Sequence, residues 1–242
     1  GTIVRNKDGT PVKQPGKFKD IKAIGWYVDM YNRAQISINF NKYKSSTIHD
    51  VFDEACALAT ERGIRVTGSE LVGLIPLEAL IMAGRHYLKK QNRSTGVSEK
   101  MIVETAIQSL GLGDVTPFDS DEKIIDYAVR KDADDLIQFT LNDFVEELGS
   151  NSPAPGGGSV SALCGSLGAG LASMVAVLTH EKKEFIDDKP KMNILGEEAQ
   201  KLKDRLLWLV DEDTKAFNNI MASNRLPQSN PQEKLVKTKA VL

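Results

Sequence analysis

The first third of the chain alternates between strand and helix patterns. Apolar and polar residues alternate strictly over residues 34–40, as in a strand with one buried face, and residues 21–28 are predicted to form a neighbouring strand. An apolar stripe predicts a helix over residues 47–62, followed by a short strand at 64–67 and a helix at 77–90. Strand–helix–strand order with short links predicts a βαβ crossover and a sheet covered by helices.

The second half shows no strand pattern. Thr140 is followed three residues later by Asp143, which resembles a capping box at a helix start, and a Pro/Gly-rich loop follows at residues 151–158. Two long helices are predicted near 159–180 and 191–223, which is typical of an α-helical bundle.

These patterns predict an α+β fold. A small α/β sandwich subdomain with βαβ units is expected over residues 1–91, and an all-α helical bundle domain over residues 138–242. Residues 92–137 hold two shorter helices and an Asp-rich segment, and we expect them to connect the two domains. The chain begins with Gly and ends in a helical pattern without a stop signal, so both ends look cut.

Composition narrows the class of protein. The chain is 41% hydrophobic and 26% charged with a net charge of −2, which gives no electrostatic case for binding nucleic acid or an anionic membrane. Cys56 and Cys164 lie in amphipathic or apolar stretches, and we expect buried thiols in a reducing compartment. No basic segment followed by an apolar one opens the chain, so a cytoplasmic location is expected.

Residues 160–178 carry no charge and are rich in Gly, Ala and Ser. Such a segment is just long enough to cross a bilayer. Close packing inside a helical bundle explains it equally well, because small residues let helix backbones approach one another. The flanks hold no pair of aromatic anchors, which favours the bundle.

The glycine-rich loop before this segment is a candidate binding element. Gly156, Gly157 and Gly158 let the backbone approach a ligand closely, and Ser159 then starts the helix. A helix start presents backbone N–H groups to an anion such as a carboxylate. The alternative is that the glycines only make a tight entry into a packed helix. No Lys follows, so this is not a nucleotide-binding phosphate loop.

The last long helix contains a candidate acid. Asp213 shares a predicted inward stripe with Leu206, Leu209 and Ile220, whereas Asp211 lies off that stripe. An inward carboxylate is costly unless it is paired or protonated, and burial raises the pKa of such a group toward the range of a general acid. The alternatives are a structural Asp paired with a cation from another helix, or a stripe edge in water.

Gly68, Ser69 and Glu70 follow the predicted strand at 64–67, where α/β sheets often bind ligands. The alternative is an exposed loop. The three histidines have no partner at the spacing of a nucleophile or metal site, so neither catalysis nor metal binding is assigned to them. A positive charge at a helix C-terminus accounts for His180.

Several spaced segments together resemble one family. Residues 139–148 (FTLNDFVEEL), 152–159 (SPAPGGGS), 174–179 (MVAVLT), 210–217 (VDEDTKAF) and 225–227 (RLP) are similar to the opening of the cyclodeaminase family. Residues 25–27 (GWY), 34–39 (AQISIN) and 68–76 (GSELVGLIP) resemble the C-terminal subdomain of glutamate formiminotransferase. The order matches that of the fused formiminotransferase-cyclodeaminase family.

The resemblance implies a bifunctional folate enzyme of histidine degradation and one-carbon metabolism, a transferase and a lyase. It implies transfer of a formimino group from N-formiminoglutamate to tetrahydrofolate, then cyclisation of 5-formiminotetrahydrofolate to 5,10-methenyltetrahydrofolate with release of ammonia. The family's transferase histidine belongs to an N-terminal subdomain outside this chain, and the cyclodeaminase domain looks truncated. We therefore expect the fragment to be inactive alone. The alternative is a non-catalytic piece for folate binding or oligomer assembly.

The resemblance also implies roles for the candidates. The family's cyclodeaminase acid maps onto the Asp-Glu-Asp run, where Asp213 is the first choice and Asp211 the second. Substrate or folate binding is expected at Gly68, Ser69, Glu70, Gly156, Gly157, Gly158 and Ser159. The family often has Gln where this chain has Glu70, and a carboxylate accepts hydrogen bonds but does not donate them. The implied ligands are formiminoglutamate and tetrahydrofolate as a substrate, with or without a polyglutamate tail. We expect no bound metal and no binding to nucleic acid or a membrane. We expect the protein to form a homo-oligomer.

Overall fold

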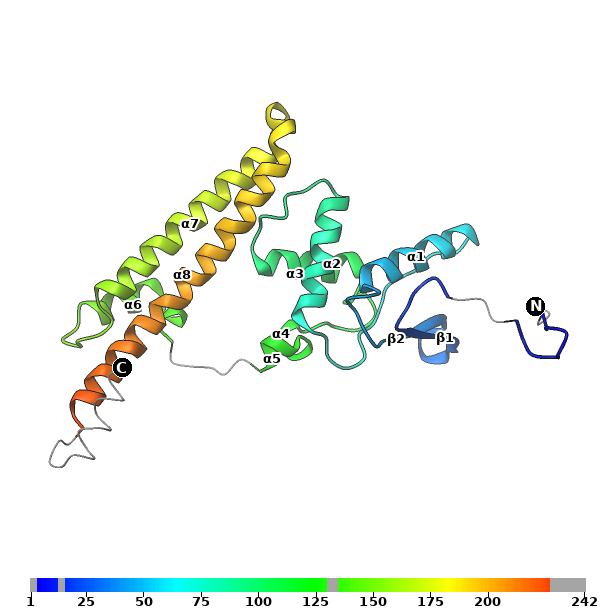
Figure 1. Cartoon of the computed structure of the whole chain (residues 1–242), viewed down its shortest axis with the longest axis horizontal. Coiled ribbons are helices and arrows are strands. Elements are labelled where there is room, and N and C mark those ends of the chain that lie inside the picture. The colour runs from blue at the N-terminus through cyan, green and yellow to red at the C-terminus, as the bar shows by residue number, and fades with distance from the viewer. Residues whose placement is uncertain (1–3, 13–15, 130–134, 227–242) are drawn as a thin grey trace. The chain divides into compact units, whose positions relative to one another are not determined.

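The protein was analysed as a computed structural model that describes residues 4–12, 16–129 and 135–226. By its internal contacts the chain forms two compact units (Figure 1). The first comprises Gly1–Tyr87 and Val103–Ala128, and the second Leu88–Ile102 and Val129–Leu242. Each unit is described by itself.

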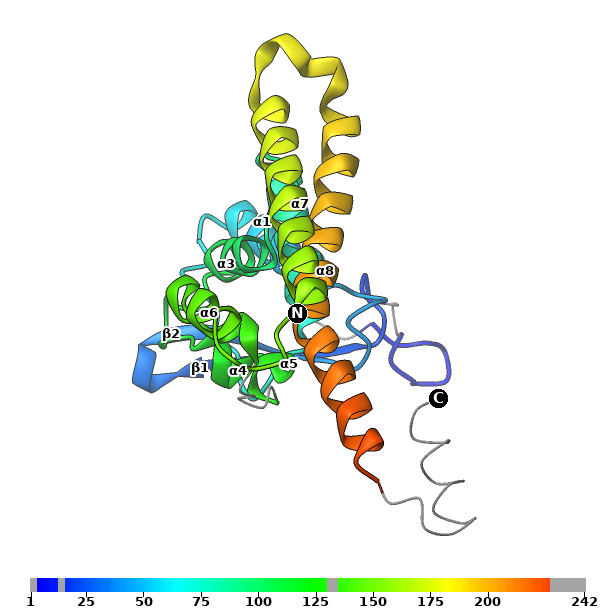
Figure 2. The same cartoon turned by 90° about the vertical axis from the view of Figure 1, so that its left-hand side faces the viewer.

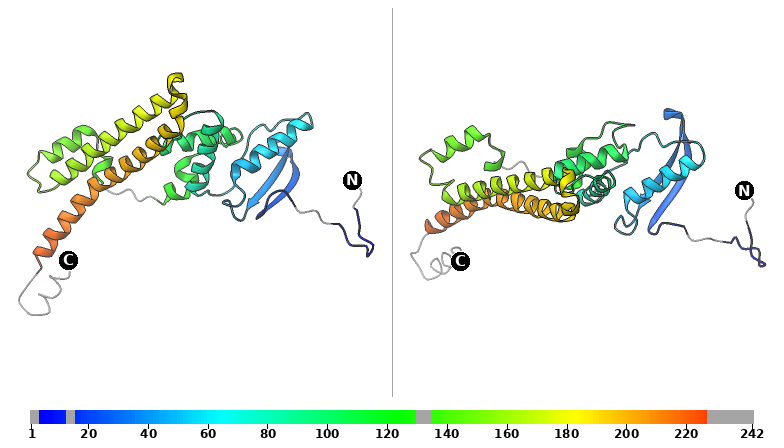
Figure 3. Two further views of the ribbon diagram at one scale, coloured as in Figure 1. Left: turned by 45° about the horizontal axis from the view of Figure 1, so that its top comes forward. Right: turned by 90° about the horizontal axis from the view of Figure 1, so that it is seen from above.

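The first unit begins with a β-hairpin, drawn in blue in Figure 3. Strands β1 (Ile21–Val28) and β2 (Arg33–Phe40) pair antiparallel, with Ile21 opposite Phe40 and Val28 opposite Arg33. A 3₁₀ turn, η1 (Asp29–Tyr31), joins them. Both strands are confirmed within a residue of the predicted bounds.

The predicted βαβ crossover is wrong. In the described part of the chain the sheet contains β1 and β2 alone, and residues 64–67 form no strand. Ile64 is 64% exposed, so this segment lies on the surface instead of pairing with the hairpin. A short apolar run becomes a strand only when a sheet edge offers it backbone partners, and periodicity alone does not reveal that.

Helices complete the first unit. Helix α1 (Ile48–Glu61) starts at Thr47, whose side chain accepts the backbone N–H of Asp50. Helices α2 (Leu77–Lys90), α3 (Glu99–Leu110), α4 (Ser120–Lys123) and α5 (Ile125–Ala128) follow. The division between the units falls inside α2 and α3.

Residues 103–128 share the core of the first unit, although the sequence placed them in a connection. Their apolar side chains are buried against those of residues 75–87, because α3 and the segment after it each present an apolar face. The buried core consists of Ile75, Ala79, Leu80, Ala83, Tyr87, Val103, Ala106, Leu110, Leu112 and Ile124.

In the described residues that follow 134, the second unit contains helices and connecting turns and no strand. It contains η2 (Leu136–Gln138), α6 (Leu141–Leu148), α7 (Gly157–Glu181), η3 (Lys183–Asp188) and α8 (Lys189–Asn224). The predicted cap of α6 is confirmed, because Thr140 Oγ1 accepts the Asp143 N–H at 3.1 Å. Helices α7 and α8 run antiparallel side by side (Figures 1 and 2). The α+β class is therefore confirmed.

Hydroxyl groups at every seventh residue of α7 line its contact with α8. Ser159 Oγ donates to the Val210 carbonyl and Ser166 Oγ to the Lys203 carbonyl, each at 2.9 Å. The next member, Ser173, donates at 3.0 Å to the carbonyl of Gly96. All three serines are buried, and their small side chains let the helices approach closely.

The predicted inward stripe of α8 is confirmed in part. A Cβ added to Gly165 of α7 would lie 3.0 Å from Leu206 Cδ1, and Asp213 accepts the Ser159 N–H, so these two members face α7. At the ends of the stripe, Leu202 is 53% exposed and Ile220 is 47% exposed. The buried residues of α8 are Gly196, Val210, Asp211 and Ser223. Hydrophobic periodicity therefore identified the middle of the contact face and missed its ends.

The opposite side of α7 is not covered by any of the residues that the structure describes. Among the described helices, α7 is the one whose length and composition would allow it to cross a membrane. Its exposed large apolar residues are Leu167, Leu171, Met174, Val175 and Leu178. The expectation of buried thiols is wrong, since Cys164 on α7 is exposed and Cys56 on α1 is half-buried.

Candidate functional site

The structure brings two candidate segments of the second unit together. Asp213, on α8, lies at the start of α7, where its Oδ2 accepts the backbone N–H of Ser159 at 2.9 Å. Ser159 Oγ lies 3.1 Å from the same oxygen. Ser159 is fully buried, whereas Asp213 is exposed. The carboxylate is therefore held by a buried residue on one side and can be reached from solvent on the other.

Asp213 serves as the cap that α7 otherwise lacks. Gly156, the N-cap residue, has no side chain to accept an N–H group, and the carboxylate from α8 takes that place. A negative charge at this position is also favoured by the dipole of α7. An anionic ligand at the same helix start would therefore be repelled by Asp213. This favours the interpretation of the loop as a tight entry into a packed helix.

The three glycines differ in what surrounds them. A Cβ added to Gly158 would lie 2.2 Å from Asp213 Oδ1, so this position must be glycine while the carboxylate keeps its place. A Cβ at Gly156 or Gly157 would meet nothing within 4 Å. The outer two glycines thus leave open space beside Asp213 that a ligand could enter.

Asp211, not Asp213, is the buried carboxylate of the pair. It is 4% exposed, and its Oδ1 accepts the backbone N–H of Leu136 at 2.6 Å. Burial raises its pKa, and the negative charge of Asp135 adds to this, while the N–H groups of Leu136 and Ile137 oppose the rise. The environment expected for Asp213 is therefore found two residues earlier, where the carboxylate anchors η2.

The segment Gly68–Glu70 of the first unit is tied to the end of α3. Ser69 donates its N–H to the Gly111 carbonyl at 2.9 Å and its hydroxyl to the Leu110 carbonyl at 2.5 Å. A Cβ on Gly68 would lie 2.8 Å from Asp114 Cβ. Glu70 is half-buried and has no hydrogen-bond partner among the described residues, so it alone of the three is available to a ligand.

The histidines are placed differently from expectation. His180 is 3% exposed, and burial lowers its pKa, so its predicted role as a charge at the helix end is wrong. His49 and His86, far apart in sequence, lie together in the first unit. Sequence spacing could not reveal this pair, because α1 and α2 meet only in the fold. The one signal was that each lies on a helix with an apolar stripe.

Comparison with known proteins gives two family matches in order along the chain. A formiminotransferase domain model matches residues 2–130, and a formiminotransferase-cyclodeaminase model matches residues 140–242. The chain is 41% identical over 231 residues to formimidoyltransferase-cyclodeaminase of Dictyostelium discoideum, covering 94% of this chain and 43% of that protein. It is 37% identical over 230 residues to the protein of the same name from Sus scrofa, covering 94% and 42%.

A shorter relative matches part of the chain. Methenyltetrahydrofolate cyclohydrolase of Methylorubrum extorquens is 34% identical over 95 residues, which covers 39% of this chain and 46% of that protein. The chain therefore spans less than half the length of the curated relatives that it matches.

Proposed function

Because the chain belongs to the formiminotransferase-cyclodeaminase family, we propose that it acts in folate-dependent histidine degradation. The proposed substrates are N-formiminoglutamate and tetrahydrofolate, and the second step converts 5-formiminotetrahydrofolate to 5,10-methenyltetrahydrofolate and ammonia. The observation that carries the proposal is the order of the two family matches in one chain, residues 2–130 and then residues 140–242.

Asp213 is the proposed proton carrier of the cyclisation. In the amidinium form of the substrate, N10 adds to the formimino carbon and must lose its proton. A carboxylate beside it can accept this proton and pass it to the exocyclic nitrogen, which leaves as ammonia while the methenyl cation remains. Asp213 suits this shuttle because it is exposed, and because its Oδ1 has no hydrogen-bond partner among the described residues.

The neighbouring residues hold this carboxylate in place. Ser159 fixes Oδ2 through its backbone N–H, and Gly158 leaves room for Oδ1. The open positions of Gly156 and Gly157 let the substrate approach. Asp211, two residues before Asp213, has a structural role and ties η2 to α8.

In the first unit, Glu70 is the proposed contact to the formimino group. A carboxylate can accept hydrogen bonds from the N–H groups of an amidine. Gly68 and Ser69 hold the loop against the end of α3 and need not touch the ligand.

A second candidate is a non-catalytic role in folate binding or assembly. The exposed apolar residues of α7 and of α6, among them Leu141 and Val145, favour association with another chain, and a homo-oligomer is the proposed partner. We keep a cytoplasmic location as part of the proposal. Cys56 and Cys164 form no disulfide, which agrees with a reducing compartment.

The test is to supply 5-formiminotetrahydrofolate and to follow methenyl formation and ammonia release separately. Production of both in equal amounts supports the cyclisation. Saturable folate binding without turnover supports the second candidate. Because the chain spans less than half the length of its relatives, both are also assayed in a protein extended to their length, and absence of both binding and turnover there contradicts the proposal. Assay of methenyltetrahydrofolate hydrolysis distinguishes a cyclohydrolase, the activity named for the Methylorubrum extorquens relative.

A further inference from the structure

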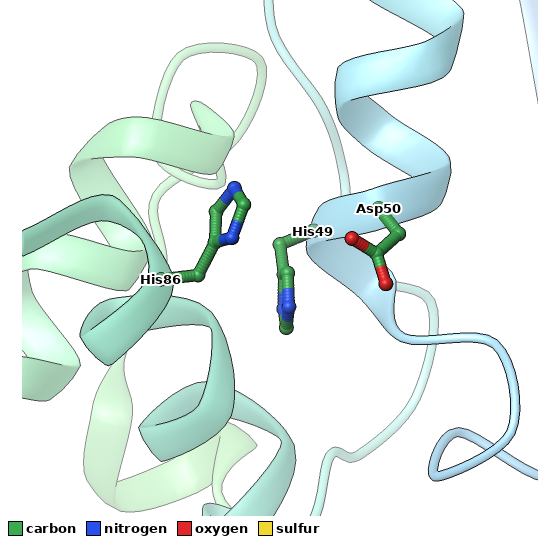
Figure 4. Close-up of side chains that lie close together, drawn as sticks. All are labelled: His49, Asp50 and His86. Carbon is green, nitrogen blue, oxygen red and sulfur yellow. The ribbon is translucent and has the colours of Figure 1, made fainter. Parts of the chain in front are cut away.

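Side chains of the types that bind metals lie together in the first unit, and none of them is among the catalytic or folate-binding candidates described above. His49 and Asp50 come from the first turn of α1, and His86 comes from α2 (Figure 4). One potential ligand atom from each residue lies within 4.8 Å of the other two. We propose that His49, Asp50 and His86 bind one divalent first-row transition-metal ion, of which Zn²⁺ is the best fit.

The buried imidazole of His49 points to a ligand. His49 is 8% exposed, and its Nδ1 is buried without a hydrogen-bond partner in the described structure. A buried polar atom without a partner is costly, and the great majority of buried side-chain polar atoms have one. A ligand at Nδ1 of His49 would supply the missing partner, and a neutral imidazole nitrogen is a common metal ligand.

His86 is oriented as metal-binding histidines are. Its Nε2 lies 3.0 Å from Asp53 Oδ2. A neutral imidazole that donates Nε2–H to a carboxylate keeps its lone pair on Nδ1, and metal-bound histidines commonly have such a carboxylate behind them. Asp53 also lies 3.3 Å from the Tyr87 hydroxyl, which fixes the carboxylate from its other oxygen.

Asp50 supplies the third donor and can be reached from solvent. It is exposed, and Thr47 Oγ1 donates to its Oδ2 at 2.6 Å, which holds the carboxylate at the helix start. Asp50 and Asp53 line an open hollow of about 690 Å³ together with Glu54, Ser45 and two lysines. An ion from solvent can therefore reach the Asp50 carboxylate through this hollow.

The donor set selects the class of ion. Two imidazole nitrogens and one carboxylate oxygen suit Zn²⁺, Co²⁺, Mn²⁺ or Fe²⁺, whereas Mg²⁺ and Ca²⁺ prefer oxygen alone. Donor atoms on one tetrahedral zinc lie roughly 3.3 Å apart, given metal–ligand distances of about 2.0–2.1 Å. The three side chains must therefore close slightly around the ion.

The closure has a specific form. The rings of His49 and His86 are stacked, with centroids 4.4 Å apart and planes at 28°. A nitrogen lone pair lies in the plane of its ring, and two stacked rings lie in nearly parallel planes, so one ring must rotate for both lone pairs to point at a single ion. Metal binding should therefore break the stack, whereas a pair of histidines that merely packs α1 against α2 would keep it.

The test is a titration of chelator-treated protein with Zn²⁺, followed by calorimetry and by NMR of the imidazole rings. The chain has three histidines, so each ring can be assigned. We expect one Zn²⁺ per chain, with shifts in the signals of His49 and His86 and none in those of His180. No saturable binding at one ion per chain, or shifts confined to His180, would overturn the proposal.

Variants distinguish direct binding of the metal from general electrostatic attraction by the charged hollow. Asp50→Asn and His86→Gln should raise the Zn²⁺ dissociation constant by at least tenfold. Asp53→Asn should raise it by roughly 10–100-fold through loss of the carboxylate that orients His86. Glu54→Gln removes the same charge from the same hollow and should leave the constant unchanged. Because Asp50 is exposed, its variant tests the site even where a change at His49 prevents folding. Equal affinity in Asp50→Asn and wild type would refute the site.

Discussion

The carboxylate of Asp213 accepts the backbone N–H of Ser159 at 2.9 Å, although the two residues are 54 positions apart in the chain. This contact joins the end of one long helix to the start of another. It also places the proposed proton carrier beside the glycine loop, so the site depends on the packing of α7 against α8.

Replacement of Asp213 by Asn should abolish the cyclisation while formimino transfer continues. The amide oxygen can still accept the Ser159 N–H, so the cap is kept and only the proton carrier is lost. Loss of a general acid or base lowers the rate of its step about 10²–10⁴-fold. Ammonia release and formimino transfer are measured separately in the active protein. Ammonia release at the wild-type rate would show that Asp213 carries no proton.

The matched control for that variant is Asp211→Asn. Asp211 is buried and holds the Leu136 N–H, and an Asn can accept the same hydrogen bond. Because burial raises the pKa of Asp211, its ionised form is disfavoured in the fold. The neutral amide should therefore leave the unfolding free energy at pH 7 equal or higher, with activity retained. A loss of activity equal to that of Asp213→Asn would make Asp211 the better candidate for the acid.

Gly158→Ala should impair the site, and Gly157→Ala should not. The new Cβ at residue 158 would lie 2.2 Å from Asp213 Oδ1, so the carboxylate must leave the Ser159 N–H. Loss of a helix cap costs about 0.5–2 kcal/mol in unfolding free energy, and the cyclisation should slow with it. At residue 157 the Cβ meets nothing within 4 Å, so that variant should keep both stability and activity. Urea unfolding and ammonia release measure the two effects.

Gly96 and Gly196 form a close contact between backbones within the second unit. A Cβ on Gly96 would lie 2.6 Å from Gly196 Cα, and one on Gly196 would lie 2.9 Å from Gly96 Cα. Alanine at either position should lower the unfolding free energy by about 1–3 kcal/mol, because backbone on both sides must move. Gly168→Ala, inside α7 with open space around it, should raise it by roughly 0.5–1 kcal/mol. Denaturant unfolding of the three variants checks both signs.

Acid should destabilise the fold through His180. Burial, and then the positive charge of Lys189, lower its folded pKa below the ordinary 6.5. The unfolded chain then binds the proton more readily, so His180 favours the fold fully above about pH 6.5 and loses this contribution as pH falls through the folded pKa. The melting temperature should fall between about pH 7 and pH 5, and less so in His180→Leu. An equal fall in that variant would assign the effect elsewhere, and His49, whose pKa burial also lowers, is the first alternative.

Local features of the fold could be predicted from the sequence. The bounds of β1, β2 and α2 follow from periodicity and from Gly and Pro, and the cap at Thr140 follows from Asp143 three residues on. The strand at 64–67 could not be judged this way, because a strand needs a partner that is distant in sequence. Periodicity also misplaced the ends of the contact face of α8, since Leu202 and Ile220 are exposed and hydrophobicity alone does not show what covers a residue.

Contacts between distant segments were likewise not predictable at the candidate site. Asp213 and Ser159 were each identified from their segments, yet their contact arises only when α7 and α8 pack. The choice of which carboxylate is buried was reversed, because Asp211 faces η2, a segment that no helical stripe could place. His49 and His86 were set aside for lack of a spacing pattern, and only the meeting of α1 and α2 makes them neighbours.

Two serines spaced seven residues apart on α7, Ser159 and Ser166, each donate to a backbone carbonyl of α8. Backbone carbonyls recur at every turn of a helix, so these bonds alone do not select one alignment of the pair. The contact of Asp213 with the Ser159 N–H does, because sliding α8 by one turn would move the carboxylate about 5.4 Å from the start of α7. One contact therefore sets both the register of the helix pair and the position of the proposed proton carrier, so a change that shifts α8 along α7 would alter both.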